Sequence, residues 1–213
     1  MVRLIVGAVL VLVAVFLVLV MRATKKRREE MAMVAEALGW GFQPHRFSLK
    51  GKPYARLPLL RRGSFGTNAL LKEGEAVSFF DFTYVVHTGK SSQAVIQTVA
   101  LFQSEGDLPR FSLRPEHFGD RIASKLGWKD IDFEDEEDFS NAYFLKGKDE
   151  SAVRSLFNWH LRDHLSREQG WSLEGEGHWV LIYRHGKRAS PGDYARFIEA
   201  TETLFGYLEK STL

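Results

Sequence analysis

The sequence predicts an α+β protein with one N-terminal transmembrane helix, followed by a mainly antiparallel sheet with packed helices. Two observations support this prediction. Residues 4–21 form an 18-residue run that contains no charge, no proline and no polar side chain. Beyond this run, strand-like segments follow one another in hairpins and do not alternate with helices, which favours an antiparallel sheet over a doubly wound layout.

The apolar run is long enough to cross a bilayer as a helix. At about 1.5 Å per residue, residues 2–21 span roughly the 30 Å of a hydrocarbon core. The length of the run and its flanks differ from those of a cleaved signal peptide, so we expect an uncleaved anchor. Its membrane flank holds five basic residues within seven positions, namely Arg22, Lys25, Lys26, Arg27 and Arg28. The positive-inside rule then predicts a single-pass protein of the inner or plasma membrane, with the N-terminus outside and the C-terminal domain in the cytoplasm.

Charge divides the chain into two parts, 1–28 for the anchor with its basic flank and 29–213 for one cytoplasmic α+β domain. Residues 1–28 hold six Lys or Arg and no acid, so the remainder carries 23 basic and 27 acidic residues, a net charge of −4. This balance argues against a nucleic-acid partner. The chain contains no cysteine, which excludes disulfides, thiolate metal sites, iron–sulfur clusters and cysteine nucleophiles.

The first helix is predicted to continue out of the membrane. Apolar residues from Met31 to Leu38 fall at helical spacing, and Gly39 ends the helix. Residues 40–42 then form a short strand. The stretch 45–66 is rich in proline, glycine and arginine and is predicted to be a loop.

A strand-rich block follows this loop. Segments 67–72, 76–86 and 93–102 are rich in β-branched and aromatic residues, with turns expected at 73–74 and 89–90. Both faces of segment 76–86 are apolar apart from Asp81. We therefore expect this strand to be central and covered on both sides, or the sheet to curl.

The C-terminal half is predicted to contain short strands and three helices. The expected elements are a strand at 111–113, a helix at 116–126, a strand near 131, a strand at 139–145, a helix at 150–167 capped by Asp149, a hairpin of 171–174 with 178–183, and a last helix from Ser190 onward.

Part of this pattern resembles a group of uncharacterised bacterial membrane-anchored proteins. The residues that carry the resemblance are Phe80-Asp81-Phe82-x-Tyr84, Leu108-Pro109-x-Phe111-x-Leu113-x-Pro115-Glu116, Asp130-Ile131, Phe139 and Tyr143. The similarity covers about residues 36–210 and implies a common domain. That group has no assigned activity, so the resemblance implies no catalytic residues.

Two histidines are the candidates for metal chemistry. His160 and His164 lie four apart on the predicted helix 150–167, and a helical wheel places both near the centre of its apolar stripe. This spacing allows two imidazoles to reach one metal ion, but Leu161 stands where the glutamate of the metalloprotease motif belongs. Two ligands do not make a zinc site, and we predict neither a metal nor a cofactor.

Asp81 is a lone carboxylate in an apolar strand. A buried carboxylate needs a cationic or hydrogen-bonding partner, because its pKa otherwise rises. We predict that it forms a structural pair with Arg114. Residues 130–138 hold seven acids in nine positions without the pattern of a calcium loop, so we expect a solvated acidic turn there.

These features together predict a non-enzymatic binding or interaction module at the cytoplasmic membrane face. Its expected partners are the lipid bilayer and an unidentified protein. Two alternatives remain open. One is a membrane-tethered, metal-dependent hydrolase that uses His160 and His164, and the other is a lipid- or small-ligand-binding module with an aromatic-lined cavity between the sheet and the last helix.

Overall fold

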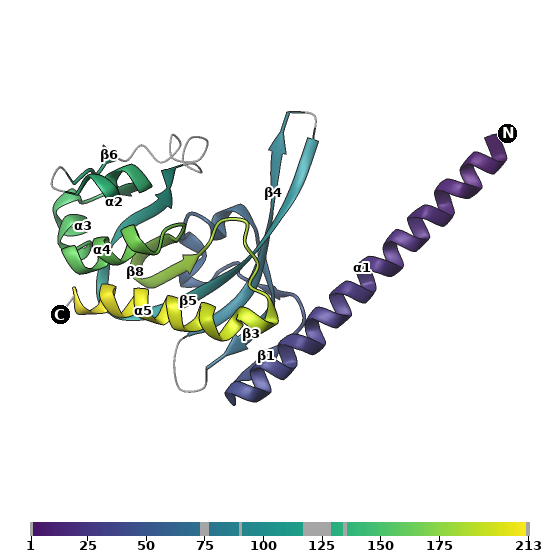
Figure 1. Ribbon diagram of the computed structural model, residues 1–213, viewed down its shortest axis with the longest axis horizontal. Helices are drawn as coiled ribbons and strands as arrows, with labels where there is room; N and C mark the ends of the chain where they lie inside the picture. The colour runs from purple at the N-terminus through teal and green to yellow at the C-terminus, as the bar shows by residue number, and fades with distance from the viewer. Residues whose placement is uncertain (1, 73–76, 90, 117–128, 134–135, 212–213) are drawn as a thin grey trace.

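The computed structural model describes the chain except for residues 1, 73–76, 90, 117–128, 134–135 and 212–213. An N-terminal helix, α1 (Val2–Leu38), projects away from an α+β domain, as Figure 1 shows. The fold class predicted from the sequence is therefore confirmed. The helix predicted at 116–126 and the turn predicted at 73–74 fall almost entirely outside the described residues.

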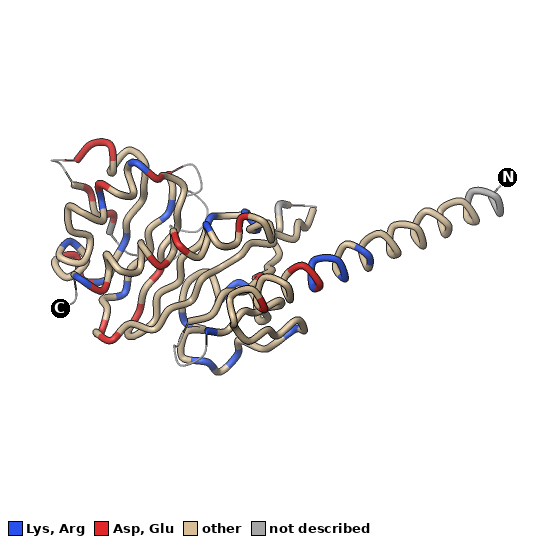
Figure 2. Tube along the Cα trace, turned by 60° about the horizontal axis from the view of Figure 1, so that its bottom comes forward, with Lys and Arg blue, Asp and Glu red and all other residues tan. Residues whose placement is uncertain are grey.

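Helix α1 is unbroken but occupies two environments. Its N-terminal part contains an 18-residue window with a mean hydropathy of 2.8, none of which is buried, so it is long and apolar enough to cross a membrane. Its C-terminal part joins the domain, where Met31 and Ala35 are buried at the predicted helical spacing. Gly39 ends the helix with a φ of 67°. Figure 2 shows a band of Lys and Arg between the two parts.

Within the described residues, one antiparallel sheet contains all eight strands. They are β1 (Gly41–Gln43), β2 (Phe47–Ser48), β3 (Phe65–Leu71), β4 (Ser78–Thr88), β5 (Ser91–Pro115), β6 (Lys129–Asp130), β7 (Tyr143–Gly147) and β8 (Ser172–Tyr183). The order is β1-β3-β4-β5-β7-β6, with β2 also on β3 and β8 also on β5. The predicted three-strand block corresponds to β3, β4 and the start of β5, and β4 is central as expected.

Strand β5 is longer than predicted because it continues past Pro109. Strands β4 and β7 follow one another along one edge of β5, and β8 covers the other edge. The register shifts between Gln103 and Phe111, around a proline that has no N–H to donate, so the strand is bulged but not ended. The predicted hairpin at 171–183 is wrong for a related reason, because this segment pairs as one strand along the long β5.

The helices of the domain are α2 (Glu137–Ala142), α3 (Glu150–Leu156), α4 (Trp159–Arg167) and α5 (Tyr194–Lys210). Residues 139–142 are helical and only 143–145 of the predicted strand 139–145 is extended. The predicted helix 150–167 is divided in two, because the Asn158 side chain accepts a hydrogen bond from the N–H of Leu161 and so begins α4. The last helix is confirmed as α5, preceded by the 3₁₀ turn η5 (Pro191–Asp193).

Both faces of the sheet are covered, as the two apolar faces of β4 predict. We call the face that packs against α1, α3, α4 and α5 the helix face; its core includes Phe79, Phe102 and Phe111. The opposite face, the loop face, is covered by residues 49–60, whose leucines pack on Phe80 and Phe82. The arginine-rich stretch 45–66 is therefore more than a surface loop, and it contains the short 3₁₀ segments η1 (Pro53–Arg56) and η2 (Leu60–Arg62).

The close contact of β8 with β5 generates a stability prediction. A Cβ on Gly175 would lie 2.2 Å from Cε1 of Phe111, whose ring is fully buried against Phe157. We expect Gly175→Ala to lower the free energy of unfolding by about 1–3 kcal/mol in urea titrations of the detergent-solubilised protein. Gly192→Ala is the control, because nothing lies within 4 Å of its Cβ position. An unchanged midpoint for Gly175→Ala would contradict this packing.

Candidate functional site at the base of the membrane helix

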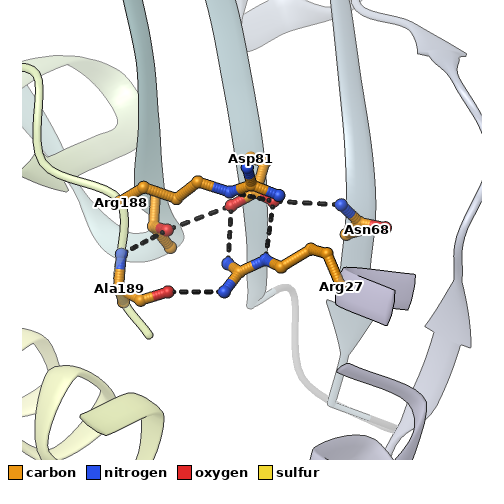
Figure 3. A network of polar contacts seen from close by, with 6 residues as sticks. Arg27, Asn68, Asp81, Arg188 and Ala189 are labelled. Carbon is orange, nitrogen blue, oxygen red and sulfur yellow. Dashed lines mark hydrogen bonds and ion pairs between the residues drawn. The ribbon is translucent and has the colours of Figure 1, made fainter. Parts of the chain in front are cut away.

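Asp81 lies in the central strand β4, and its side chain is only 2% exposed. Its Oδ1 accepts hydrogen bonds from Arg27 Nη2 at 3.0 Å and from Thr98 Oγ1 at 3.1 Å. Its Oδ2 accepts from Asn68 Nδ2 at 3.0 Å, Arg188 Nε at 3.1 Å and Arg27 Nε at 3.3 Å. Figure 3 shows these donors converging on the carboxylate from four separate segments of the chain.

Arg27 is the residue of α1 that binds this carboxylate. Its guanidinium binds Asp81 through two nitrogens, and Nη1 donates to the carbonyl oxygen of Ala189 at 2.7 Å. The side chain is 9% exposed, whereas Arg22, Lys25 and Lys26 of the predicted membrane flank are exposed. The reason lies in the helical period, since Arg27, Met31 and Ala35 are four residues apart and share the buried face of α1. The core of the domain therefore begins at Arg27, within the part that charge alone assigned to the anchor.

Local backbone geometry aims two further donors at Asp81. The register of β3 against β4 shifts between Thr67 and Leu70, and Asn68 within this bulge has a φ of 52°. A bulge re-aims a side chain, and asparagine tolerates the left-handed region better than most residues. Thr98 is the direct cross-strand neighbour of Asp81 on β5, and its Oγ1 also accepts from the N–H of Ala189 at 2.9 Å.

The network joins α1, the β3–β4–β5 core of the sheet and the segment between β8 and η5. Asp81 accepts five hydrogen bonds, more than the roughly four lone-pair positions of a carboxylate, so donors occupy both of its oxygens. The charge of Asp81, together with burial, raises the pKa of Tyr194, with burial as the larger cause. We call Arg27, Asn68, Asp81, Thr98 and Arg188 the helix clamp.

The predicted pair of Asp81 with Arg114 is wrong. Ala100, Phe102 and Phe111 all lie in the core of the helix face. In a regular strand, odd-numbered Phe111 would point to the opposite face from even-numbered Ala100 and Phe102. The bulge between them shifts the alternation of side chains by one, so Arg114 points to the loop face while Asp81 points to the helix face. Arg114 Nη2 instead donates to Glu174 at 3.1 Å.

Glu174 is a second buried carboxylate, which was not predicted from the sequence. It is fully buried, and its carboxylate accepts from Arg114, from the hydroxyl of Tyr183 at 3.0 Å and from the N–H of Leu59 at 2.7 Å. Burial, followed by the charge of Glu174, raises the pKa of Tyr183 well above its usual value. The only available signal was an acid between apolar positions of a strand, the same signal that marked Asp81.

The two candidate metal ligands do not form a site. His160 is exposed and its ring meets Trp159, while His164 is half-buried against Tyr207. The helix break at Asn158 changes the phase on which the helical wheel relied. Among the residues that the structure describes, no group of three His, Asp or Glu side chains could hold a metal ion.

The place predicted for an aromatic-lined cavity is largely filled. Between the sheet and α5, the rings of Phe102 and Phe205 stack with centroids 4.6 Å apart. A cleft of about 260 Å³ remains at the start of α5, where Trp171, Arg188 and Phe197 are among its lining residues. A larger and more polar cleft, about 980 Å³, lies beside the arginine-rich loop, and we call it the basic cleft; Lys52, Arg56, Arg61, Arg110, Glu176, His178 and Trp179 line it.

The clamp generates a mutational prediction with a control on the adjacent residue. Arg27→Leu removes two bonds to a buried carboxylate and should lower the free energy of unfolding by on the order of 3 kcal/mol, measured in urea with the solubilised full chain. Lys26→Leu removes a side chain that is 77% exposed and pairs with Glu30 in the next turn of the helix, so it should change stability by less than about 1 kcal/mol. Equal effects of the two substitutions would contradict a buried clamp.

The loop face generates a pH prediction through His185. Burial, then the charges of Arg62 and Arg114, lower the pKa of His185 below 6.5. The unfolded chain therefore binds the proton of His185 more tightly than the folded chain does. Neutral His185 contributes fully to stability above about pH 6.5, and this contribution is lost as pH falls through the pKa of the folded state. His185→Gln should flatten this acid-side slope in unfolding titrations, and an unchanged slope would contradict the assignment.

Comparison with known proteins connects the fold to one solved structure. No protein-family model matches the chain, and no curated protein matches it. The crystal structure of the mycobacterial trehalose monomycolate transport factor A, TtfA, is similar, with a TM-score of 0.62 over 90% of this chain and 97% of that one. The two sequences are 13% identical, so the similarity establishes a shared fold.

Proposed function

We propose that the protein is a membrane-anchored, non-enzymatic binding module whose domain is held at the cytoplasmic face of the inner or plasma membrane. The observation that carries this proposal is the helix clamp. Arg27 makes the end of α1 part of the buried core of the domain, so the domain does not hang from a flexible linker. A module fixed in this way presents its surfaces to partners at a defined height and angle.

The position of the clamp sets that height. Arg22 is the first charged residue after the apolar run, and Arg27 follows five residues later. Five residues of helix correspond to about 8 Å, so the clamp lies directly beneath the membrane surface. Arg22, Lys25 and Lys26 remain exposed on α1, and this excess of positive charge supports a cytoplasmic domain.

Binding is favoured over catalysis because of how the buried acids are used. Asp81 and Glu174 are each enclosed by several hydrogen-bond donors, which occupy most of the oxygen lone pairs that a catalytic carboxylate would use. The basic cleft supplies the candidate binding surface, with the side chains of Lys52, Arg56 and Arg61 at its edge. TtfA is named a transport factor, so we propose that the partner is a component of a membrane transport system.

The lipid- or small-ligand-binding alternative is supported by one specific observation. The 260 Å³ cleft at the start of α5 combines the rings of Trp171 and Phe197 with the cations Arg184 and Arg188, and Arg184 lies 4.3 Å from the centre of the Trp171 ring. Such a cleft suits a small ligand that has both an apolar and an anionic part. In the capture experiment described below, Arg56→Glu should reduce the yield of crosslinked partner and Trp171→Ala should leave it unchanged. That result would separate partner binding at the basic cleft from ligand binding at the start of α5.

The anchor and its orientation can be tested in intact cells and in vesicles. A reporter that is active only in the cytoplasm, fused after Leu213, should be active, and the full chain should float with vesicles in the absence of detergent. An active reporter of the opposite compartment would overturn the orientation. Free protein at the bottom of the gradient would overturn the anchor itself.

Partner capture can be localised to the basic cleft. A photo-crosslinking residue in place of Arg61 should capture a membrane protein in intact membranes, and Arg56→Glu should reduce the yield severalfold by reversing charge beside it. The same crosslinker in place of Arg167, which is 75% exposed on α4, serves as the control. Equal capture from both positions would argue against a binding role for the cleft.

A further inference from the structure

The hairpin formed by β4 and β5 extends beyond the part of the sheet that is covered. The register continues without interruption from Asp81 opposite Thr98 to Thr88 opposite Ser91, and Gly89 lies in the turn with a φ of 58°. Figure 1 shows the hairpin rising on the same side of the domain as the N-terminal part of α1, with its turn pointing away from the sheet.

One face of this hairpin has no cover within the described residues. Thr83 and Val85 alternate with Asp81 on β4, and Ile96 and Ala94 are their cross-strand neighbours, so all four lie on the helix face. Val85 is 49% exposed and Ile96 is 40% exposed. The opposite face differs, because Tyr84 is buried there and Val86 and Val95 pack against the core of the loop face.

The clamp fixes where this uncovered face lies relative to the membrane helix. Asp81 and Arg27 are in contact, so the hairpin and the N-terminal part of α1 start from the same level. From Asp81 to Val85, four residues of strand extend about 14 Å, and Ile96 lies opposite Thr83, about 7 Å along the strand from Asp81. From Arg27 to Arg22, five residues of helix rise about 8 Å. A hairpin that runs alongside α1 therefore brings Val85 and Ile96 to about the level at which the helix enters the bilayer.

We propose that the β4–β5 hairpin is a second membrane contact, in which Val85 and Ile96 lie against the interfacial region of the bilayer. The inference rests on the anchored orientation proposed above. We assign the lipid surface as the partner of this face because the clamp joins the face directly to α1. In addition, Arg22 and Lys25 are exposed on α1 at the level of the hairpin, and such cations attract anionic headgroups. Two separated contacts would fix the tilt of the domain as well as its height.

The test uses single cysteines, since the chain contains none. The full chain carrying Val85→Cys or Ile96→Cys is labelled with an environment-sensitive fluorophore and reconstituted in vesicles of phosphatidylcholine and phosphatidylglycerol. Both labels should show emission shifted to shorter wavelength, quenching by lipids with a nitroxide near the headgroup, and loss of quenching by iodide. Ser155→Cys, at an exposed position of α3 far along the chain from the hairpin, should stay accessible to iodide.

Each other outcome overturns the proposal in a distinguishable way. In one outcome, iodide reaches the labels at 85 and 96 as readily as the label at 155 while the protein still floats with the vesicles. That result would reject the hairpin contact and leave the anchor intact. Labels shielded from iodide but not quenched by the nitroxide lipids would show that a second copy of the chain, the only other protein in the vesicles, covers this face instead of lipid. Protein that does not float would reject the anchored orientation and the hairpin contact together.

Discussion

The contact between Arg27 and Asp81 is the constraint on which the rest of the structure depends. It joins the first element of the chain to the central strand of the sheet, and the same carboxylate also holds Arg188 from the segment that leads into the last helix. A buried charge is tolerated only when it is paired and hydrogen-bonded. The clamp therefore requires α1, β4 and the start of α5 to assemble together, and it makes the C-terminal part of α1 a structural element of the domain.

The sheet has buried ion pairs on both faces, and a bulge in β5 decides which pair forms on which face. Before the bulge, the strand presents Thr98 to the helix face beside Asp81; after it, the strand presents Arg114 to the loop face beside Glu174. Each carboxylate is enclosed by donors, and this arrangement stabilises one specific fold.

The parts of the fold that follow from local periodicity could be predicted from the sequence. The apolar run, the alternating strands β3 to β5, the end of α1 at Gly39 and the amphipathic α5 are of this kind.

Predictions failed where tertiary pairing overrides local signals. The sequence predicts separate strands at 93–102 and 111–113, yet pairing with β8 carries β5 through both and past Pro109. It predicts one helix at 150–167, although the side chain of Asn158 caps α4. The sequence marked Asp81 as needing a partner, but the choice between Arg27 and Arg114 depended on the bulge, which alternation alone does not reveal. Charge alone does not reveal that Arg27 is buried, whereas its spacing from Met31 and Ala35 places all three on one face of α1.

The central claim is that α1 and the domain move as one body, and a distance measurement across the clamp tests it most directly. Spin labels at Thr24→Cys on α1 and Thr203→Cys on α5, both exposed positions, can be placed in the full chain in lipid bilayers. The account predicts one narrow distribution of label-to-label distances, which broadens when Arg27→Leu is added. A broad distribution in the chain with Arg27 intact would contradict the account, because the domain would then pivot freely about the membrane helix.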